Sequence, residues 1–247
     1  MSTVNTQNVK NAGSSKNNIV LSTSGDTTIQ SLNTGPLAGL RNQLINGDFR
    51  VWQRQGDSPI SVTGTGEYTA DRWFARGPTH TGGTTEMSKD TKADLGATAK
   101  IVVAGHSSYF AMNQYIEEIN IRSCIGLEMS VSFVTDFPDP AIAVEVYDAS
   151  QNATGVSVSS IVQNGSKYSA TFTMPNSISA LDDEKGLNLR IFANGTTGVL
   201  PDGTYYIAQV QLEPGPVATP FEAIPISLSL ANCQRYFIRK YVEYSEW

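Results

Sequence analysis

Apolar and polar residues alternate with a period of two along much of the chain. Such alternation predicts strands with one buried face and one solvent-facing side, as in antiparallel sheets. Polar or small residues mostly separate the apolar positions of each run. These apolar positions are Leu127, Met129, Val131 and Phe133; Ile142, Val144 and Val146; Tyr168, Ala170, Phe172 and Met174; Leu187, Leu189 and Ile191; and Tyr206, Ala208, Val210 and Leu212.

Turn-forming residues separate the runs, and few helical patterns interrupt them. Asn-Gly or Asp-Gly pairs occur at Asn46-Gly47, Asn164-Gly165, Asn194-Gly195 and Asp202-Gly203, where backbones with positive φ are tolerated. An α/β fold would place long helical segments between the strands. The pattern therefore predicts an all-β fold, an antiparallel jelly-roll β-sandwich over residues 39–222.

The first 38 residues form a separate N-terminal segment and linker in this prediction. They are rich in Asn, Ser and Thr, and they contain no aromatic residue. Ile19 to Leu21, a turn at Ser24-Gly25-Asp26 and a return over residues 27–32 predict a small hairpin. An isolated hairpin is marginal in water, so this one needs a partner surface. A disordered leader is the alternative.

The last 25 residues, 223–247, also differ from the central region. Leu230, Cys233, Phe237 and Tyr241 are spaced by three or four residues, which suits one face of a helix. We predict a short helix over residues 227–235. An extended tail then packs on the sandwich or on a neighbouring subunit.

Composition and charge exclude two classes of partner. The 247 residues carry a formal net charge of −6, and Arg239-Lys240 is the nearest approach to a basic run. Proteins that bind nucleic acid need clustered Lys and Arg to replace phosphate counterions, so we expect no nucleic-acid partner. No apolar run is long enough to span a bilayer, and the polar N-terminus lacks a signal peptide. We therefore expect no membrane insertion.

The sequence contains no recognisable catalytic constellation, so we expect the protein not to be an enzyme. His80 and His106 both lie in loop-like contexts rich in Gly, Ser and Thr. The acidic pairs are sequence neighbours, and adjacent carboxylates on a strand point to opposite faces, which is poor geometry for acting on one bond. These pairs are Glu117-Glu118, Asp136 with Asp139, and Asp182-Asp183.

Metal and thiol chemistry gives few candidates. Cys124 and Cys233 lie far apart and lack the paired spacing of a zinc site, so they are predicted to be reduced, half-buried thiols. Asp48 and Glu213 would supply oxygen ligands for a structural calcium ion if the first and last strands of the sandwich pair. The favoured alternative is that Asp48 stabilises its own turn. We expect no other cofactor.

Aromatic side chains are the best candidates for ligand contact, because they stack on the apolar faces of sugars and dominate interface energy. Trp52 and Trp73 lie in strand-like patterns and are predicted to be core residues. Tyr109 and Phe110 are adjacent, so one of them is expected to face outward. The predicted contact surface consists of Tyr109, Phe110, Asn113, Gln114 and Tyr115.

Four segments in a fixed order resemble one known family. They are LINGDFRVWQR (44–54), YTADRWF (68–74), YYIAQVQLEPGPVATPFE (205–222) and CQRYF (233–237). Together they resemble tail-fibre and appendage proteins of tailed bacteriophages, common among cyanophages. The central domain of that family resembles the jelly rolls of carbohydrate-binding modules. The resemblance implies that the NGDF-type segment pairs near the QLE-type strand and closes the sandwich.

The resemblance also implies a place in a phage virion. Residues 9–32 resemble N-terminal attachment segments, with Asn18, Ile19, Val20 and Leu21 as the predicted attachment residues. The implied assembly is a homotrimer, built in the host cytoplasm, that contacts other virion proteins. Its sandwich would be exposed for adhesion to host-surface glycans.

Two alternative functions stay open. Related chains often continue beyond the CQRY-type motif, whereas this one ends at Trp247, so a purely structural adaptor or a head or neck decoration protein is the first alternative. A glycan-cleaving enzyme is the second, and the missing catalytic constellation disfavours it.

Overall fold

The structure is a computed structural model that describes residues 8–9, 19–21, 27–29, 40–54, 56, 58–77, 83–105, 109–176, 185–196 and 199–239. The helical segments are α1 (Glu118–Ile121), η1 (Arg122–Cys124) and α2 (Ile226–Gln234). The strands are β1 (Asn8–Val9), β2 (Ile19–Leu21), β3 (Thr27–Ile29), β4 (Ile60–Ser61), β5 (Glu67–Tyr68), β6 (Phe74–Arg76), β7 (Thr84–Lys92), β8 (Gly96–Ala104), β9 (Ala111–Ile116), β10 (Glu128–Thr135), β11 (Ala141–Tyr147), β12 (Ala153–Val156), β13 (Val162–Asn164), β14 (Lys167–Thr173), β15 (Leu187–Phe192) and β16 (Gly203–Pro214).

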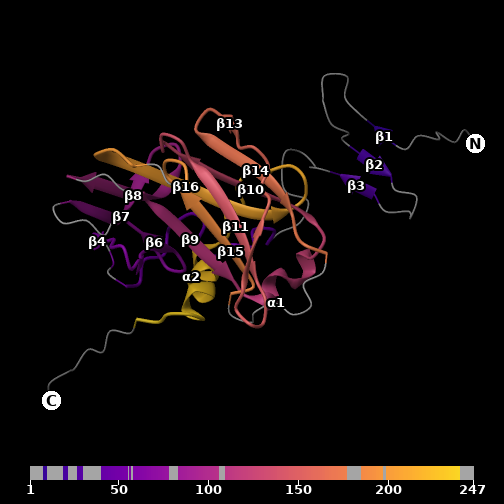
Figure 1. Ribbon diagram of the computed structural model, residues 1–247, viewed down its shortest axis with the longest axis horizontal. Helices are drawn as coiled ribbons and strands as arrows, with labels where there is room; N and C mark the ends of the chain where they lie inside the picture. Colours follow the sequence, from indigo (N-terminus) through magenta and orange to yellow (C-terminus); the bar gives the residue numbers. More distant parts are fainter. Residues whose placement is uncertain are drawn as a thin grey trace, which may run out of the picture.

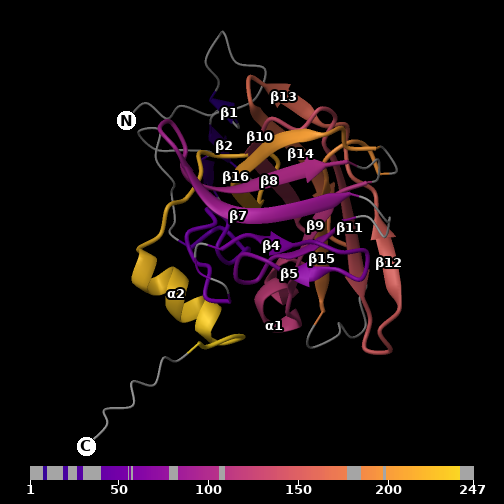
Figure 2. The same cartoon turned by 90° about the vertical axis from the view of Figure 1, so that its left-hand side faces the viewer.

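Two antiparallel sheets form the body of the protein (Figures 1 and 2). The strand order is β13-β14-β10-β16-β8-β7-β4 in the seven-stranded sheet and β12-β11-β15-β9-β6-β5 in the six-stranded sheet. Some neighbouring strands are consecutive in the chain, such as β7 and β8, whereas others come from distant parts of it, such as β10 and β16. The predicted antiparallel jelly-roll sandwich is confirmed.

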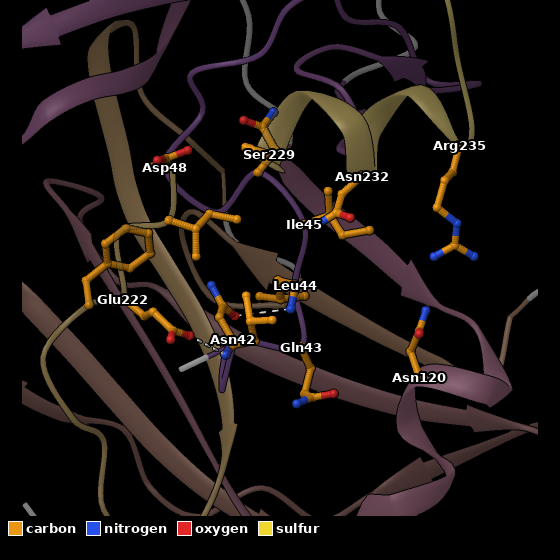
Figure 3. Close-up of a pocket in the computed structure, with 14 residues that line it drawn as sticks. Asn42, Gln43, Leu44, Ile45, Asp48, Asn120, Glu222, Ser229, Asn232 and Arg235 are labelled. Atoms are coloured by element: carbon orange, nitrogen blue, oxygen red, sulfur yellow. Dashed lines mark hydrogen bonds between the residues drawn. The ribbon is translucent and has the colours of Figure 1, made fainter. Parts of the chain in front are cut away.

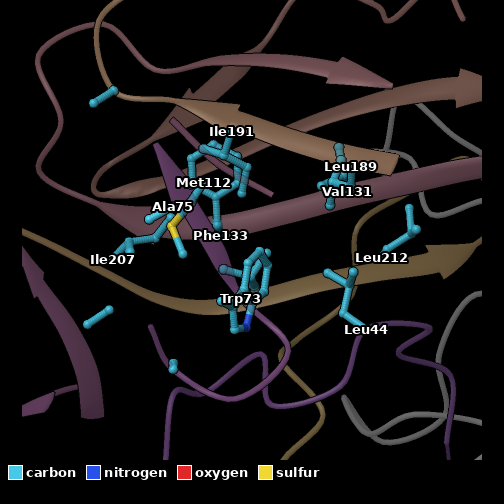
Figure 4. Close-up of a cluster of buried hydrophobic side chains, with 14 of the residues drawn as sticks. Leu44, Trp73, Ala75, Met112, Val131, Phe133, Leu189, Ile191, Ile207 and Leu212 are labelled. Atoms are coloured by element: carbon cyan, nitrogen blue, oxygen red, sulfur yellow. The ribbon is translucent and has the colours of Figure 1, made fainter. Parts of the chain in front are cut away.

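The inward faces of the two sheets make one continuous apolar core. Figure 4 shows side chains from strands of both sheets gathered in this layer. Burying each such side chain contributes about 1.5–3 kcal/mol. Most of the predicted alternation is confirmed, since these residues are buried: Met129, Val131, Phe133, Val144, Val146, Tyr168, Ala170, Phe172, Met174, Leu187, Leu189 and Ile191. Trp52 and Trp73 are core residues as predicted.

The last strand, β16, departs from the predicted alternation. Ser132 of β10 lies opposite Gln211, but Val134 lies opposite Ala208, so β16 carries one extra residue. Gln209 at this bulge has a φ of 53°. A one-residue insertion reverses which side chains face the core. Val210 therefore faces the core as predicted, whereas Tyr206 lies outside it.

The NGDF segment pairs with β16 but is not a regular strand. The Val210 amide donates to the Gly47 carbonyl at 2.8 Å, and the Gln43 amide donates to the Leu212 carbonyl at 2.8 Å. A Cβ on Gly47 would lie 2.0 Å from the Val210 carbonyl oxygen, so this contact requires glycine. Asn46 has a φ of 58°, as expected for its turn.

The segment after β16 crosses the outer face of the seven-stranded sheet. The Ser130 hydroxyl donates to the Gly215 carbonyl at 2.6 Å, and Lys167 Nζ donates to the Thr219 carbonyl at 2.9 Å. Residues that alternation places on this outer face, including Gln211, are therefore buried. The crossing segment therefore covers part of the outer face of the seven-stranded sheet.

The C-terminal helix agrees with the predicted position. α2 spans Ile226–Gln234 and buries Ser229 and Cys233. It lies at the same end of the sandwich as α1 (Figures 1 and 2). No helix in the described ranges has the length and apolar character needed to cross a bilayer.

The predicted N-terminal hairpin is present within a third sheet. β2 pairs antiparallel with β3 and with β1, in the order β1-β2-β3. Ile19, Val20 and Leu21 make up the central strand. Asn18, the remaining predicted attachment residue, lies outside the described residues.

Candidate functional site

Side chains from β6, β9 and β15 meet on the outer face of the six-stranded sheet. Met112 and Ile191 point into the core, so Asn113 and Arg190 point outward. The register places Asn113 between Arg190 of β15 and Phe74 of β6. Polar, cationic and aromatic groups therefore adjoin one another across these three strands.

A pocket of about 230 Å³ lies on this face, and we call it the sheet-face pocket. Buried side chains of Ala111, Asn113 and Phe192 line it, together with more exposed residues around them. These more exposed residues are Arg76, Tyr109, Arg190 and Thr196. Its lining offers an aromatic surface and several hydrogen-bonding groups, which is the composition of a small-ligand site.

Asn113 contributes to this pocket a buried polar atom without a partner among the described residues. Its side chain is only 4% exposed, and its Nδ2 has no hydrogen-bond partner in the described part of the chain. A buried donor without a partner costs about 1–3 kcal/mol, so native structures seldom leave one unpaired. A ligand that accepts a hydrogen bond here would remove that cost.

A second polar cluster on the same face centres on Glu145 of β11. Glu145 Oε2 accepts hydrogen bonds from Asn188 Nδ2 at 3.0 Å and from the Tyr147 hydroxyl at 3.3 Å. Arg190 forms an ion pair with the same oxygen at 3.4 Å. Burial, with Tyr115 and Glu145 nearby, raises the pKa of Tyr147 to about 12, so its hydroxyl remains a donor at neutral pH.

The structure separates the five predicted contact residues into two groups. Tyr109 and Asn113 line the sheet-face pocket, and Tyr115 lies on the same outer face beside Tyr147, with ring centroids 6.0 Å apart. Phe110 is 1% exposed and belongs to the core. Gln114 is buried and bonds the Ile45 backbone through both its oxygen and its nitrogen. Phe110 and Gln114 are therefore structural residues.

Sequence reasoning missed the cationic and aromatic residues that other strands bring to this pocket. Arg76, Arg190 and Phe192 come from β6 and β15. The sequence did contain one indication of Phe192. It is an apolar residue at an outward-facing position, where the alternation predicts a polar residue. Only the strand register reveals that these residues adjoin Asn113.

Another pocket, of about 220 Å³, lies where the chain enters the sandwich (Figure 3). Its labelled polar side chains come from residues 42–48, α1, α2, the residue after α2 and the segment before that helix. Glu222 Oε2 accepts from the amides of Arg41 and Asn42, and Asn42 Oδ1 accepts from the Leu212 amide at 3.0 Å. These hydrogen bonds connect the first residues of the sandwich to β16 and to the segment after it, so we assign this pocket a structural role.

Asp48 and Glu213, the two predicted calcium ligands, each lie in an ion pair. Asp48 forms an ion pair with Arg50 in its own turn, which agrees with the favoured alternative. Glu213 forms an ion pair with Arg41 at 3.1 Å and accepts the Thr219 amide at 2.8 Å. The two carboxylates thus have separate cationic partners. Across the described ranges, no three His, Cys, Asp or Glu residues cluster so as to hold a metal.

Three of the acidic residues considered for catalysis have structural partners. Glu117 pairs with Arg235 at 3.2 Å, and Glu118 pairs with Arg122. Asp136 accepts the Tyr206 amide at 2.7 Å. The histidines His80 and His106 and the pair Asp182-Asp183 lie outside the described residues.

Both cysteines are unpaired and more deeply buried than predicted. Cys124 and Cys233 are each 1% exposed and form no disulfide. Burial raises the pKa of Cys124, and burial with Asp71 nearby raises the pKa of Cys233 to about 12. Both thiols are therefore protonated and unreactive at neutral pH.

The CQRYF motif holds the first two motifs in place. The Arg72 guanidinium lies 3.5 Å from the centroid of the Tyr236 ring, and that of Arg54 lies 4.0 Å from the centroid of Phe237. Gln53 Nε2 donates to the Phe237 carbonyl at 2.9 Å. Motifs far apart in sequence thus form one scaffold.

Comparisons with protein-family models and with curated proteins give no match. Among solved structures, the chain is similar to the enzymatically active domain of bacteriophage CBA120 tailspike protein 4, with a TM-score of 0.41 and 12% identity over 71% of this chain and 22% of the tailspike chain. It is also similar to the C-terminal family 22 carbohydrate-binding module of Clostridium thermocellum Xyn10B, with a TM-score of 0.37 and 12% identity over 70% and 98% of the two chains. A non-crystalline cellulose-specific module, CBM28, gives a TM-score of 0.36 and 10% identity over 72% and 95%.

Proposed function

We propose that this chain is an adhesion protein of a bacteriophage virion, which binds host-surface glycans without cleaving them. The observation that carries the proposal is the sheet-face pocket, where aromatic rings and hydrogen-bonding side chains surround the unpaired Nδ2 of Asn113. Aromatic faces stack on sugar rings, and fixed polar groups select among hydroxyl arrangements. The four motifs that resemble phage appendage proteins support the place in a virion.

A glycan array with the purified full-length protein tests glycan binding. We expect reproducible binding to a subset of glycans, reduced by about tenfold or more in Tyr109→Ala and Asn113→Ala, because each change removes a stacking surface or a buried polar contact. The matched control is Tyr206→Ala, which removes an aromatic ring from the seven-stranded sheet. A blank array would favour a purely structural virion protein, and release of reducing ends from a bound glycan would favour the enzyme.

The N-terminal sheet supports a trimeric anchor in the same proposal. A sheet of three very short strands cannot bury a stable core alone, and threefold association would supply the missing partners. We expect sedimentation equilibrium to give three times the chain mass of 26.6 kDa. Replacing Ile19, Val20 and Leu21 together by serine should then give monomers. A monomeric unaltered protein, or a trimer that survives the substitution, would contradict this anchor.

A further inference from the structure

The sheet-face pocket has an unusual charge for this chain. The whole protein carries a formal net charge of −6, yet the charged residues that line this pocket are two arginines, Arg76 and Arg190. No carboxylate is among the lining residues. A cationic recess on an acidic protein favours anionic ligands and disfavours cationic ones.

The two guanidinium groups retain hydrogen-bonding capacity. Within the described ranges, no ion pair involves Arg76, and the ion pair of Arg190 with Glu145 uses one nitrogen at 3.4 Å. Each guanidinium carries five N–H donors, so most of them remain available to a ligand. Arginine binds carboxylate and phosphate groups through paired hydrogen bonds, more strongly than it binds neutral acceptors.

Asn113 adds a third donor on the floor of the same pocket. Its register position between Arg190 and Phe74 places it beside one of the arginines, and its Nδ2 is buried and unpartnered. Three donor groups that line one pocket match a ligand group that only accepts hydrogen bonds. A sugar hydroxyl both donates and accepts, whereas an ionised acid group only accepts.

We propose that the sheet-face pocket binds the acidic group of an anionic sugar unit, either a carboxylate or a phosphate or sulfate ester. The pocket volume of about 230 Å³ suits one sugar-sized group, since sites for drug-sized ligands occupy roughly 300–1,000 Å³. Phe192 supplies an apolar surface beside the arginines. This inference rests on the proposed glycan-binding function and names the class of glycan.

A glycan array of matched pairs tests this proposal. Each pair holds the same glycan with its acidic group intact and with it removed: uronic acids beside their carboxyl-reduced forms, and phosphorylated or sulfated sugars beside their unmodified forms. We expect binding to the acidic members, and the carboxylate and ester pairs identify the acidic group. Equal binding to both members of every pair would overturn the acidic preference while leaving glycan binding intact. A blank array would overturn both.

Three variants sharpen the result. Arg76→Gln should weaken binding to acidic glycans by about tenfold, because it removes one charge-assisted contact. Glu145→Gln should strengthen it by about threefold, because it frees Arg190 and removes a nearby negative charge. Lys89→Gln, on β7 of the other sheet, is the control for net charge and should leave binding unchanged. An equal loss in Lys89→Gln and Arg76→Gln would show that bulk charge, not the pocket, attracts the ligand.

Discussion

Replacing Glu213 by alanine is expected to lower the free energy of unfolding by about 3–5 kcal/mol, the usual cost of breaking a buried ion pair from one side. The Glu213 side chain is 2% exposed, and its ion-pair partner, Arg41, is 14% exposed. Removing the carboxylate leaves the Arg41 charge without its counterion. It also removes the acceptor for the Thr219 amide and hydroxyl.

The size of this effect reflects where Glu213 lies. It belongs to the QLEP part of β16, beneath the segment that crosses the seven-stranded sheet. Gln211 Nε2 donates to Glu213 Oε1 at 2.8 Å, and Gln211 Oε1 accepts the Glu222 amide at 2.7 Å. Glu222 in turn accepts the amides at the sandwich's start. One buried polar network therefore connects the first residues of the sandwich, at Arg41 and Asn42, to its last strand and the segment that follows.

Chemical denaturation of three variants measures the prediction. Glu213→Gln keeps an acceptor for Thr219 but not the charge, so its loss should be smaller than that of Glu213→Ala. The control is Arg122→Ala, in an ion pair whose arginine is 71% exposed, for which we expect a loss of about 1 kcal/mol or less. If Glu213→Ala unfolds at the same denaturant concentration as this control, the network does not stabilise the sandwich ends.

The central strands could be predicted from the sequence because each has one clean apolar face. The runs 168–174 and 187–191 bury their apolar positions as alternation requires. β7 and β8 were not among the predicted strands. β7 reads TTEMSKDTK, in which threonine and methionine supply the buried positions and charged residues fill much of the rest. Pairing with β8 determines which β7 residues are buried, and the β7 sequence alone does not predict that pairing.

The bulge in β16 and the conformation of Phe49 in the NGDF loop could not be predicted for a different reason. Both depend on positive φ at residues that seldom adopt it, Gln209 and Phe49. Single residues adopt such conformations only when surrounding contacts over-determine them. Here the contacts run between β16 and the loop, which are more than 150 residues apart. Tertiary pairing therefore overrides the local alternation of side chains.

Only part of the candidate site could be predicted, because contacts between distant segments also determine which residues line it. Tyr109 and Asn113 are close in sequence, and a search for aromatic and amide side chains identifies both. Arg76 and Arg190 reach the pocket only because β6 and β15 flank β9 in the sheet. A jelly roll places strands from distant parts of the chain side by side. The strand order therefore determines which residues lie together on one face of a sheet. A single segment of the sequence contains only some of those residues.

Replacing Trp73 by alanine is expected to cost about 3–5 kcal/mol, the typical loss for a fully buried large aromatic side chain. Trp73 is 0% exposed, and its ring lies 5.2 Å from that of Phe49, measured between centroids. Its Nε1 donates to the Asn46 carbonyl at 2.9 Å. The side chain therefore joins the YTADRWF motif to the NGDF loop, and through Gly47 to β16.

Two further variants separate packing from hydrogen bonding at this position. Trp73→Phe keeps much of the apolar volume but removes the indole donor to the Asn46 carbonyl, which then accepts only from the Phe49 amide at 3.1 Å, so it should cost about 0.5–1.5 kcal/mol. Ile119→Ala, at a side chain that is 76% exposed, should change stability by about 0.5 kcal/mol or less. Thermal or denaturant unfolding gives all three values. A Trp73→Ala variant as stable as Ile119→Ala would mean that the NGDF loop closes the sandwich without this ring. Losses in the expected order would instead identify the Trp73 ring as the packing contact that holds the two motifs together.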